Sequence, residues 1–202
     1  MKKVVLLMLI GVICLTLSAK STLETQIFFG PQFTWLTGDF SVIKSVVEDF
    51  KIHSVGGLRL GISINRYLEN NLFFGHTYIY NERGWKTSGT LDFGEYKEQF
   101  FTYQEIKYTD LIFNFGRYFQ LENNGRITPY IGLGVSAILN TNYTKYSEGF
   151  NNPNILAVTG ISFSRRNFVA GADINTTLLD VFDNQKSRFT TFGMNIGYKF
   201  GK

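Results

Sequence analysis

Apolar and polar residues alternate along the chain, most regularly in residues 192–200. The apolar positions there are Phe192, Met194, Ile196, Tyr198 and Phe200, and the positions between them are Gly193, Asn195, Gly197 and Lys199. Successive side chains of a β-strand point to opposite faces, so the pattern predicts a strand with one apolar face and one small or polar face. The same alternation recurs in residues 57–65 and 131–137.

Eight segments of this kind predict an all-β chain, with strands at residues 25–35, 54–65, 72–81, 101–117, 127–139, 154–164, 167–176 and 189–200. The connections after the odd-numbered strands are long, at residues 36–53, 82–100, 140–153 and 177–188. Those after the even-numbered strands are mostly short, at residues 66–71, 118–126 and 165–166. This asymmetry predicts an eight-stranded antiparallel up-and-down transmembrane β-barrel with both termini in the periplasm.

The apolar face is expected to contact lipid. Its clearest members are Leu58, Leu60, Ile62, Ile131, Leu133, Val135, Met194 and Ile196. In the alternative, a soluble lipocalin-like periplasmic carrier, the apolar face would point inward and the other face would be solvated and rich in charge. The second face consists mostly of Gly, Ser and Asn, as at Gly57, Gly61 and Ser63, which favours a cramped polar lumen.

Four charged residues, Arg59, Asp110, Asp173 and Lys199, fall on the predicted lumen face. Unpaired charge is costly where the dielectric constant is low, so we expect these side chains to pair with one another. Eight strands leave an interior just wide enough for side chains, so the lumen is predicted to be filled and not to form an open pore.

Residues 1–19 have the features of a secretory signal peptide: Lys2 and Lys3, an apolar run, then Ser18 and Ala19. Cleavage is predicted after Ala19, with a cut after Ser21 as the alternative. Residues 20–202 are then the barrel domain, and the mature protein is expected in the outer membrane. The single cysteine, Cys14, falls inside this signal, so the mature chain is expected to have no disulfide.

The formal net charge is +4, and removing Lys2 and Lys3 leaves +2 with the charges scattered. Nucleic-acid binding therefore has no support. Twenty Phe, eleven Tyr and twenty Gly beside only three Pro are typical of a chain with many strands.

Candidate catalytic residues are few, and we expect the protein to have no enzymatic activity and to bind no cofactor. His53 and His76 are the only histidines, and each is followed by a hydroxyl residue that a strand would turn to the opposite face. No spacing of metal ligands and no glycine-rich phosphate loop before a helix occurs. The alternative, a lipid-modifying enzyme, would require His53 or His76 beside a Ser and an acid on the outer wall.

Aromatic residues near the predicted strand ends are expected to form girdles at the membrane interfaces, with ordinary sheet packing as the alternative. They are Trp35, Tyr67, Tyr118, Phe119, Tyr130, Tyr198 and Phe200. The long connection at residues 82–100 also mixes aromatic with charged residues, including Trp85, Phe93 and Tyr96. It suits a binding edge, and equally a long hairpin that extends the barrel above the membrane.

Residues 108–119 read YTDLIFNFGRYF and are similar to the YLEIPLLLKYYF-like strand of PorT-type outer-membrane barrels of the Bacteroidetes, a group with OmpA- and OmpX-like architecture. Asp110 stands where that pattern has Glu, and Ile112 where it has Pro. The stretch PYIGLG at residues 129–134 and the ending GYKF at residues 197–200 also resemble the family. The resemblance implies that Tyr198 and Phe200 form the terminal signal for the barrel insertion machinery.

The predicted function is therefore that of a non-enzymatic integral outer-membrane barrel with a structural or accessory role through its extracellular loops. Its expected partners are outer-membrane lipid, the insertion machinery and an envelope protein bound by the loops, and the protein is expected to be a monomer. The resemblance implies a link to a secretion or envelope assembly complex, because one relative serves protein secretion.

Overall fold

The computed structural model describes residues 21–141, 152–182 and 186–200, which form ten antiparallel strands and two single helical turns. The signal peptide predicted at residues 1–19 lies outside the described residues. No helix in the described part of the chain is long and apolar enough to cross a membrane. The strands are β1 (Ser21–Gly38), β2 (Val47–His53), β3 (Val55–Leu68), β4 (Leu72–Asp92), β5 (Lys97–Arg117), β6 (Phe119–Gln120), β7 (Gly125–Thr141), β8 (Asn154–Arg165), β9 (Phe168–Thr177) and β10 (Ser187–Phe200), and the turns are α2 (Ser41–Lys44) and η1 (Glu122–Asn124).

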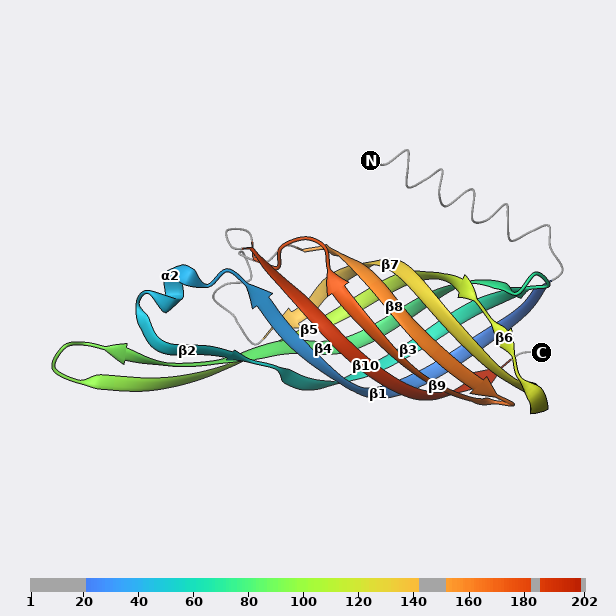
Figure 1. The fold of residues 1–202 in the computed structure, drawn as a ribbon, viewed down its shortest axis with the longest axis horizontal. Coiled ribbons are helices and arrows are strands. Elements are labelled where there is room, and N and C mark those ends of the chain that lie inside the picture. Colours follow the sequence, from blue (N-terminus) through green and yellow to red (C-terminus); the bar gives the residue numbers. More distant parts are fainter. Residues whose placement is uncertain (1–20, 142–151, 183–185, 201–202) are drawn as a thin grey trace, which may run out of the picture.

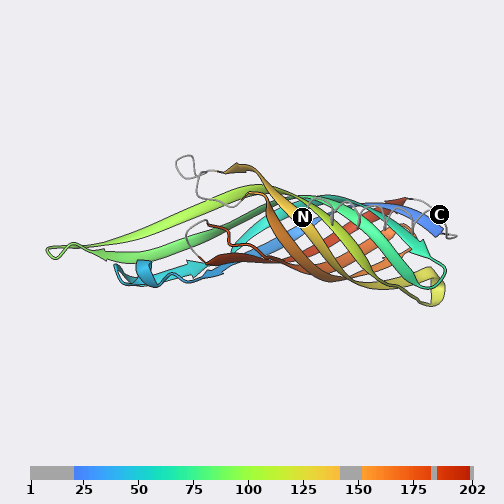
Figure 2. The same cartoon turned by 90° about the horizontal axis from the view of Figure 1, so that it is seen from above.

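Eight of the strands close into a ring. Hydrogen-bonded neighbours follow the order β4, β3, β1, β10, β9, β8, β7, β5, and β5 returns to β4. Figures 1 and 2 show these strands inclined around a common axis. The predicted eight-stranded antiparallel up-and-down barrel is thus confirmed, and each predicted strand corresponds to one member of the ring.

The side chains of each strand alternate between the wall and the lumen, as in β1, where every second residue from Glu24 to Leu36 is buried. Strand β4 has apolar residues on both faces: Phe73 and Ile79 are buried in the lumen, whereas Tyr78 and Tyr80 are exposed on the wall. Its mixed sequence pattern therefore reflects apolar filling of the interior.

The outer wall carries an uncharged belt. In the described ring, its outward positions include no Asp, Glu, Lys or Arg over residues 23–37, 58–64, 74–80, 109–115, 131–137, 155–163, 168–178 and 190–200. All eight residues predicted to contact lipid lie exposed on this wall, including Leu133 (61%) and Ile196 (47%). The apolar face thus points outward, opposite to the arrangement that a soluble carrier requires.

Two of the aromatic residues assigned to the girdles were placed wrongly. Tyr67 is buried in the lumen, where its ring stacks on that of Phe73 with 5.6 Å between centroids. Tyr130 also points inward, and its ring packs against the buried cluster of Phe28 and Ile79. Tyr198 and Phe200 do lie on the outer wall, with centroids 4.8 Å apart.

A three-stranded sheet extends beyond the ring at the end opposite Ser21 and Phe200, the first and last described residues (Figure 1). Strands β4 and β5 remain paired out to Asp92 and Lys97, whereas β5 pairs with β7 only as far out as Ile106. Strand β2 adds to the other edge of β4, through pairs from Val47–Leu91 to His53–Lys86. We call residues 47–53 and 86–105 the outer extension. Of the two alternatives for residues 82–100, a binding edge or a long hairpin, these residues form the long hairpin. The connection predicted at residues 36–53 contains α2 and β2.

Charge on the outer wall should prevent insertion. We expect Leu133→Arg and Ile196→Arg each to lower the stability of the inserted barrel by about 2 to 4 kcal/mol, because the guanidinium would lie near the bilayer midplane. Asn195→Ala, on the lumen face, is the matched control and should change little. Folding into phospholipid vesicles, followed by heat-modifiable gel mobility, measures the effect; equal folding of all three variants would contradict the lipid-facing assignment.

Candidate functional site

The upper lumen contains a buried ion pair between Arg83 of β4 and Asp110 of β5. The Arg83 guanidinium contacts Asp110 Oδ2 and donates to Ser136 Oγ at 2.8 Å. Ser136 in turn donates to the second carboxylate oxygen at 2.5 Å, and Asn81 Nδ2 donates to Oδ2 at 2.8 Å. Arg83 also lies over the Tyr108 ring, 4.9 Å from its centroid. Three neighbouring strands of the ring are thus joined across the interior.

A second ion pair joins Arg59 of β3 to Asp173 of β9. It is bidentate, with Nη1–Oδ1 and Nη2–Oδ2 distances of 2.9 and 2.7 Å. Gly193 faces this pair from β10, and a Cβ atom there would lie only 1.7 Å from Arg59 Nη1. The close approach explains why this lumen position holds glycine, since a side chain would displace the guanidinium from its carboxylate.

A third charged group lies at the end of the ring that contains Ser21 and Phe200. Glu24 accepts hydrogen bonds from Arg126 at 3.0 and 2.5 Å, and from Lys199 Nζ at 3.3 Å. The Arg126 guanidinium also lies 3.5 Å from the centroid of the Tyr67 ring. A cation–π contact of this kind and a bidentate carboxylate both hold the guanidinium across the lumen.

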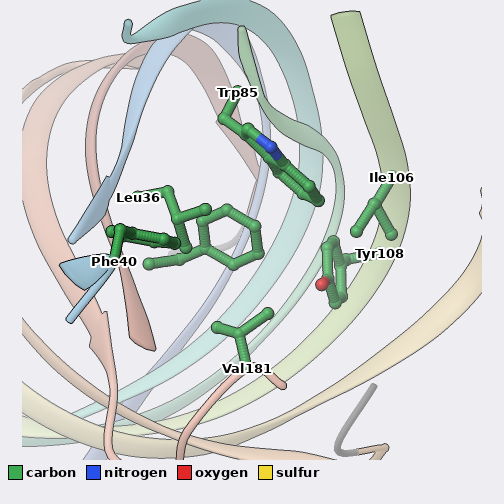
Figure 3. Close-up of a cluster of buried hydrophobic side chains, with 7 residues drawn as sticks. Leu36, Phe40, Trp85, Ile106, Tyr108 and Val181 are labelled. Atoms are coloured by element: carbon green, nitrogen blue, oxygen red, sulfur yellow. The ribbon is translucent and has the colours of Figure 1, made fainter. Parts of the chain in front are cut away.

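An apolar cluster fills the outer mouth of the ring (Figure 3). Its buried members are Leu36, Phe40, Trp85, Ile106, Tyr108, Val181 and Phe189, and Phe50, Ile52, Ile138 and Phe182 pack against them. The Trp85 ring meets Phe182 edge-on at 5.6 Å and Phe189 at 5.8 Å. Residues from the predicted outer connections thus cover the charged layers beneath.

A hollow of about 50 Å³ remains inside the ring, below the Arg59–Asp173 pair. Its polar lining includes Gln26, Ser63, Asn65, Thr77, Asn114 and Asn195. A water molecule needs roughly 10 to 15 Å³ of such space, so the hollow has room for only a few. It is far too small for a continuous ion path.

All four residues predicted to share the lumen point into it, but the structure does not bring them together as one network. Arg59 and Asp173 pair with each other, whereas Asp110 pairs with Arg83 and Lys199 with Glu24. Sequence reasoning missed Arg83 because the third strand was ended at residue 81. Arg83 has the same parity as Ile79 and Asn81, so extending that strand by one lumen position would have found it.

The outer extension presents aromatic side chains to solvent. Phe101 and Tyr103 project from β5 and are 66% and 42% exposed, and the Phe93 and Tyr96 rings stack at the hairpin tip with 5.0 Å between centroids. At this tip Glu48 accepts a hydrogen bond from Lys97 at 2.7 Å, which raises the pKa of the amine.

The two histidines lie in different surroundings. His76 is half-buried on the outer wall, with its ring edge-on to Tyr78 at 6.4 Å. His53 Nε2 lies 3.0 Å from Ser88 Oγ on the outer face of the extension. Within the described residues, no carboxylate is hydrogen-bonded to the His53 ring, and no group of acids, histidines or cysteines could hold a metal ion.

The Arg83–Asp110 pair should be essential to stability. Arg83→Met leaves the Asp110 charge buried without its cation, which typically costs about 3 to 5 kcal/mol. Unfolding by urea in phospholipid vesicles should show this loss, and the double variant Arg83→Met with Asp110→Leu should recover most of it. The control is Lys107→Met, which removes a half-exposed cation from the same hairpin and should change stability little. If Arg83→Met lowered stability no more than Lys107→Met, the lumen would not be tightly packed.

No protein-family model matches the chain, and no curated protein is similar to it in sequence, so the PorT-type resemblance stays a prediction. Among solved structures, it is similar to Ail, the attachment invasion locus protein of Yersinia pestis, in complex with the heparin analogue sucrose octasulfate, with 12% identity, coverage of 88% of this chain and 99% of that one, and a TM-score of 0.47. It is also similar to Neisserial surface protein A, with 12% identity, coverage of 90% of this chain and 99% of that one, and a TM-score of 0.48. The outer membrane protein OprG of Pseudomonas aeruginosa has 10% identity, with coverage of 91% of this chain and 99% of that one and a TM-score of 0.45.

Proposed function

We propose that this chain is a non-conducting, non-enzymatic outer-membrane barrel whose outer extension binds a partner outside the membrane. The observation that carries the proposal is the division of the molecule into a filled ring and a projecting sheet. The ring has an uncharged outer belt and a plugged lumen, while β2, β4 and β5 continue beyond it with exposed aromatic residues.

The belt supports the proposed location. An apolar wall around the whole ring has no favourable contact in water, whereas lipid covers it and the closed ring satisfies its backbone hydrogen bonds. The predicted signal peptide supports export, and the outward Tyr198 and Phe200 suit the proposed recognition by the insertion machinery.

Transport through the ring is disfavoured by its contents. Arg83, Asp110, Arg59 and Asp173 are each paired and nearly fully buried, and the apolar cluster covers them at the outer mouth. Opening a path would separate ion pairs in a low-dielectric interior, which is strongly unfavourable.

The extension projects beyond the uncharged belt, where lipid would not cover it, and exposed aromatic residues surrounded by charges are typical of protein interfaces. A link to a secretion or envelope assembly complex, as the PorT-type resemblance implies, would place an envelope protein at this surface. The proposed binding of an envelope protein rests on the exposed aromatic residues of the projecting sheet, Phe93, Tyr96, Phe101 and Tyr103.

A second candidate function is hydrolysis of a lipid ester, which the His53–Ser88 hydrogen bond favours. A serine beside a histidine is the start of a nucleophilic site, but an effective one also orients the histidine through a third group.

We expect no ester hydrolysis by the pure protein. Fatty-acid release from phospholipid and lipopolysaccharide vesicles should be the same for the wild type, for Ser88→Ala and for protein-free vesicles. Release that disappears in Ser88→Ala would make this protein an enzyme and contradict the proposal.

Single-cysteine labelling tests location and orientation together, because Cys14 is the only native cysteine. Cysteine in place of Tyr96, at the tip of the extension, should react with a membrane-impermeant maleimide on intact cells. Cysteine in place of Glu69, in the turn at the opposite end, should react only after the outer membrane is permeabilised. The reverse order, or labelling of both in a soluble periplasmic fraction, would refute the proposed placement.

A further inference from the structure

We infer that the tip of the outer extension binds an arginine-bearing segment of a partner protein, whose guanidinium stacks on the Phe93–Tyr96 ring pair and is neutralised by the surrounding carboxylates. The inference rests on the proposed function, since it states the chemistry of the partner that the extension would bind. We call residues 92–97 the hairpin tip.

The hairpin tip stands clear of the other described elements. The last pair between β5 and β7 is Ile106–Thr141, and Tyr96 lies ten residues further along the hairpin. At about 3.4 Å per residue, this separation is roughly 34 Å along the strand. Figures 1 and 2 both show the tip projecting beyond α2, β2 and the ring. None of these elements therefore covers it.

Phe93 and Tyr96 form an exposed aromatic platform at the tip. Their rings stack at an interplanar angle of 25° with 5.0 Å between centroids, yet Phe93 is 52% and Tyr96 61% exposed. Stacking covers one face of each ring, and the opposite faces remain open. Exposed apolar side chains gathered at one place mark an interaction site more often than not.

The turn between the two rings holds the platform in place. Phe93 N–H donates to the Tyr96 carbonyl at 3.0 Å, and Gly94 N–H donates to Asp92 Oδ1 at 2.8 Å. Gly94 has a φ of +81°, which glycine adopts without strain. Because the platform is ordered in advance, a partner that binds it orders few further groups on this side.

The charge around the platform is negative. Residues 47–51 and 91–98 contain five acids and two lysines, for a formal charge of −3. Lys97 is already shared between Glu48 at 2.7 Å and Asp92 at 3.3 Å. In the described part of the chain, neither Glu95 nor Glu98 forms an ion pair. A cation from outside would therefore meet carboxylates that no cation of this chain neutralises.

The sign of this charge selects the kind of occupant. A second copy would bring an equally negative tip against the first, and an anionic lipid surface would be repelled in the same way. Entry into a zwitterionic bilayer would strip water from Glu95, which lies between the two aromatic residues, and burying an unpaired carboxylate is costly. A protein surface with a basic side chain is complementary to both the rings and the charge.

The rings favour arginine over lysine as that side chain. A guanidinium is planar and weakly hydrated, so it stacks on an aromatic face while its N–H groups donate to a carboxylate. A lysine ammonium is a strongly hydrated point charge that gains less from the rings. Arginine is also enriched at protein interfaces, where lysine is depleted. Recognition by charge alone would not distinguish the two.

Peptide binding tests the inference. The protein is placed in phosphatidylcholine nanodiscs, and the probes are two short fluorescent peptides that differ only in carrying arginine or lysine between Gly-Ser spacers. Fluorescence anisotropy at physiological ionic strength should show the arginine peptide binding about fivefold more tightly, because only the guanidinium stacks on the rings. The lysine peptide reports the contribution of charge alone.

Variants of the tip separate the two contributions. The double variant Phe93→Ser with Tyr96→Ser should bind the two peptides equally, whereas Tyr96→Phe keeps the ring and should keep the preference for arginine. Glu95→Gln should weaken the binding of both peptides. Glu122→Gln, the same change in the turn at the opposite end of the ring, should alter neither. Every variant is first shown to fold by its gel mobility.

No binding of either peptide, equal binding of both by the wild type, or a preference for arginine that survives the double variant would each overturn the inference. Association of the nanodiscs with one another, or their sedimentation with phosphatidylglycerol vesicles, would instead identify a second copy or lipid as the occupant and would overturn it too. The labelling of Tyr96→Cys on intact cells is independent of these results. A labelled tip with equal peptide binding therefore rejects arginine recognition while the proposed placement of the extension stands.

Discussion

Closure of the ring is the constraint on which the rest of the structure depends. A sheet that faces lipid must pair every backbone N–H and C=O group within itself, and the return of β5 to β4 leaves no open edge within the eight-stranded ring. A closed ring of eight strands then divides each strand into a lipid face and a lumen face, and it makes the lumen so narrow that side chains must fill it. Small residues such as Gly193 provide space where the large guanidinium of Arg59 crosses.

Two of the lumen ion pairs fix the register of strands that are distant in sequence. Arg59–Asp173 joins β3 with β9, and Glu24–Arg126 joins β1 with β7. A slip of one residue in any strand would turn its lumen residues toward lipid and leave the partner charge buried alone. We interpret the pairs as penalties on wrong registers more than as sources of stability, since an apolar filling of equal volume would serve stability as well.

Much of the ring was predictable from the sequence, because its two faces differ in chemistry along nearly every strand. The alternation in β3, β7 and β10 identified strand and orientation together, and the strand ends were found to within a few residues. The alternation ends where the chain leaves the lipid: beyond Asn81 the outward positions of β4 become Glu82 and Lys86, so a paired strand there has the composition of a loop. The partners of Asp110 and Lys199 depend on how far each strand is staggered around the ring. No local pattern encodes that stagger. The misplaced Tyr67 and Tyr130 have a different cause: Tyr67 shares the parity of the lumen residue Ser63, and Tyr130 that of Ser136, so the alternation itself places both inward.

Strands β4 and β5 each continue for 21 residues without interruption, from the end of the ring opposite the extension to the tip of the extension. At about 3.4 Å per residue, each strand of this hairpin has a contour length of roughly 70 Å. The hairpin carries Arg83 and Asp110 in the lumen and Phe93 and Tyr96 at its tip. A tensile load applied at the tip along the strands would act on many ladder hydrogen bonds in shear at once, because these bonds lie perpendicular to the strands. Force on the extension would thus pass directly to the wall of the ring.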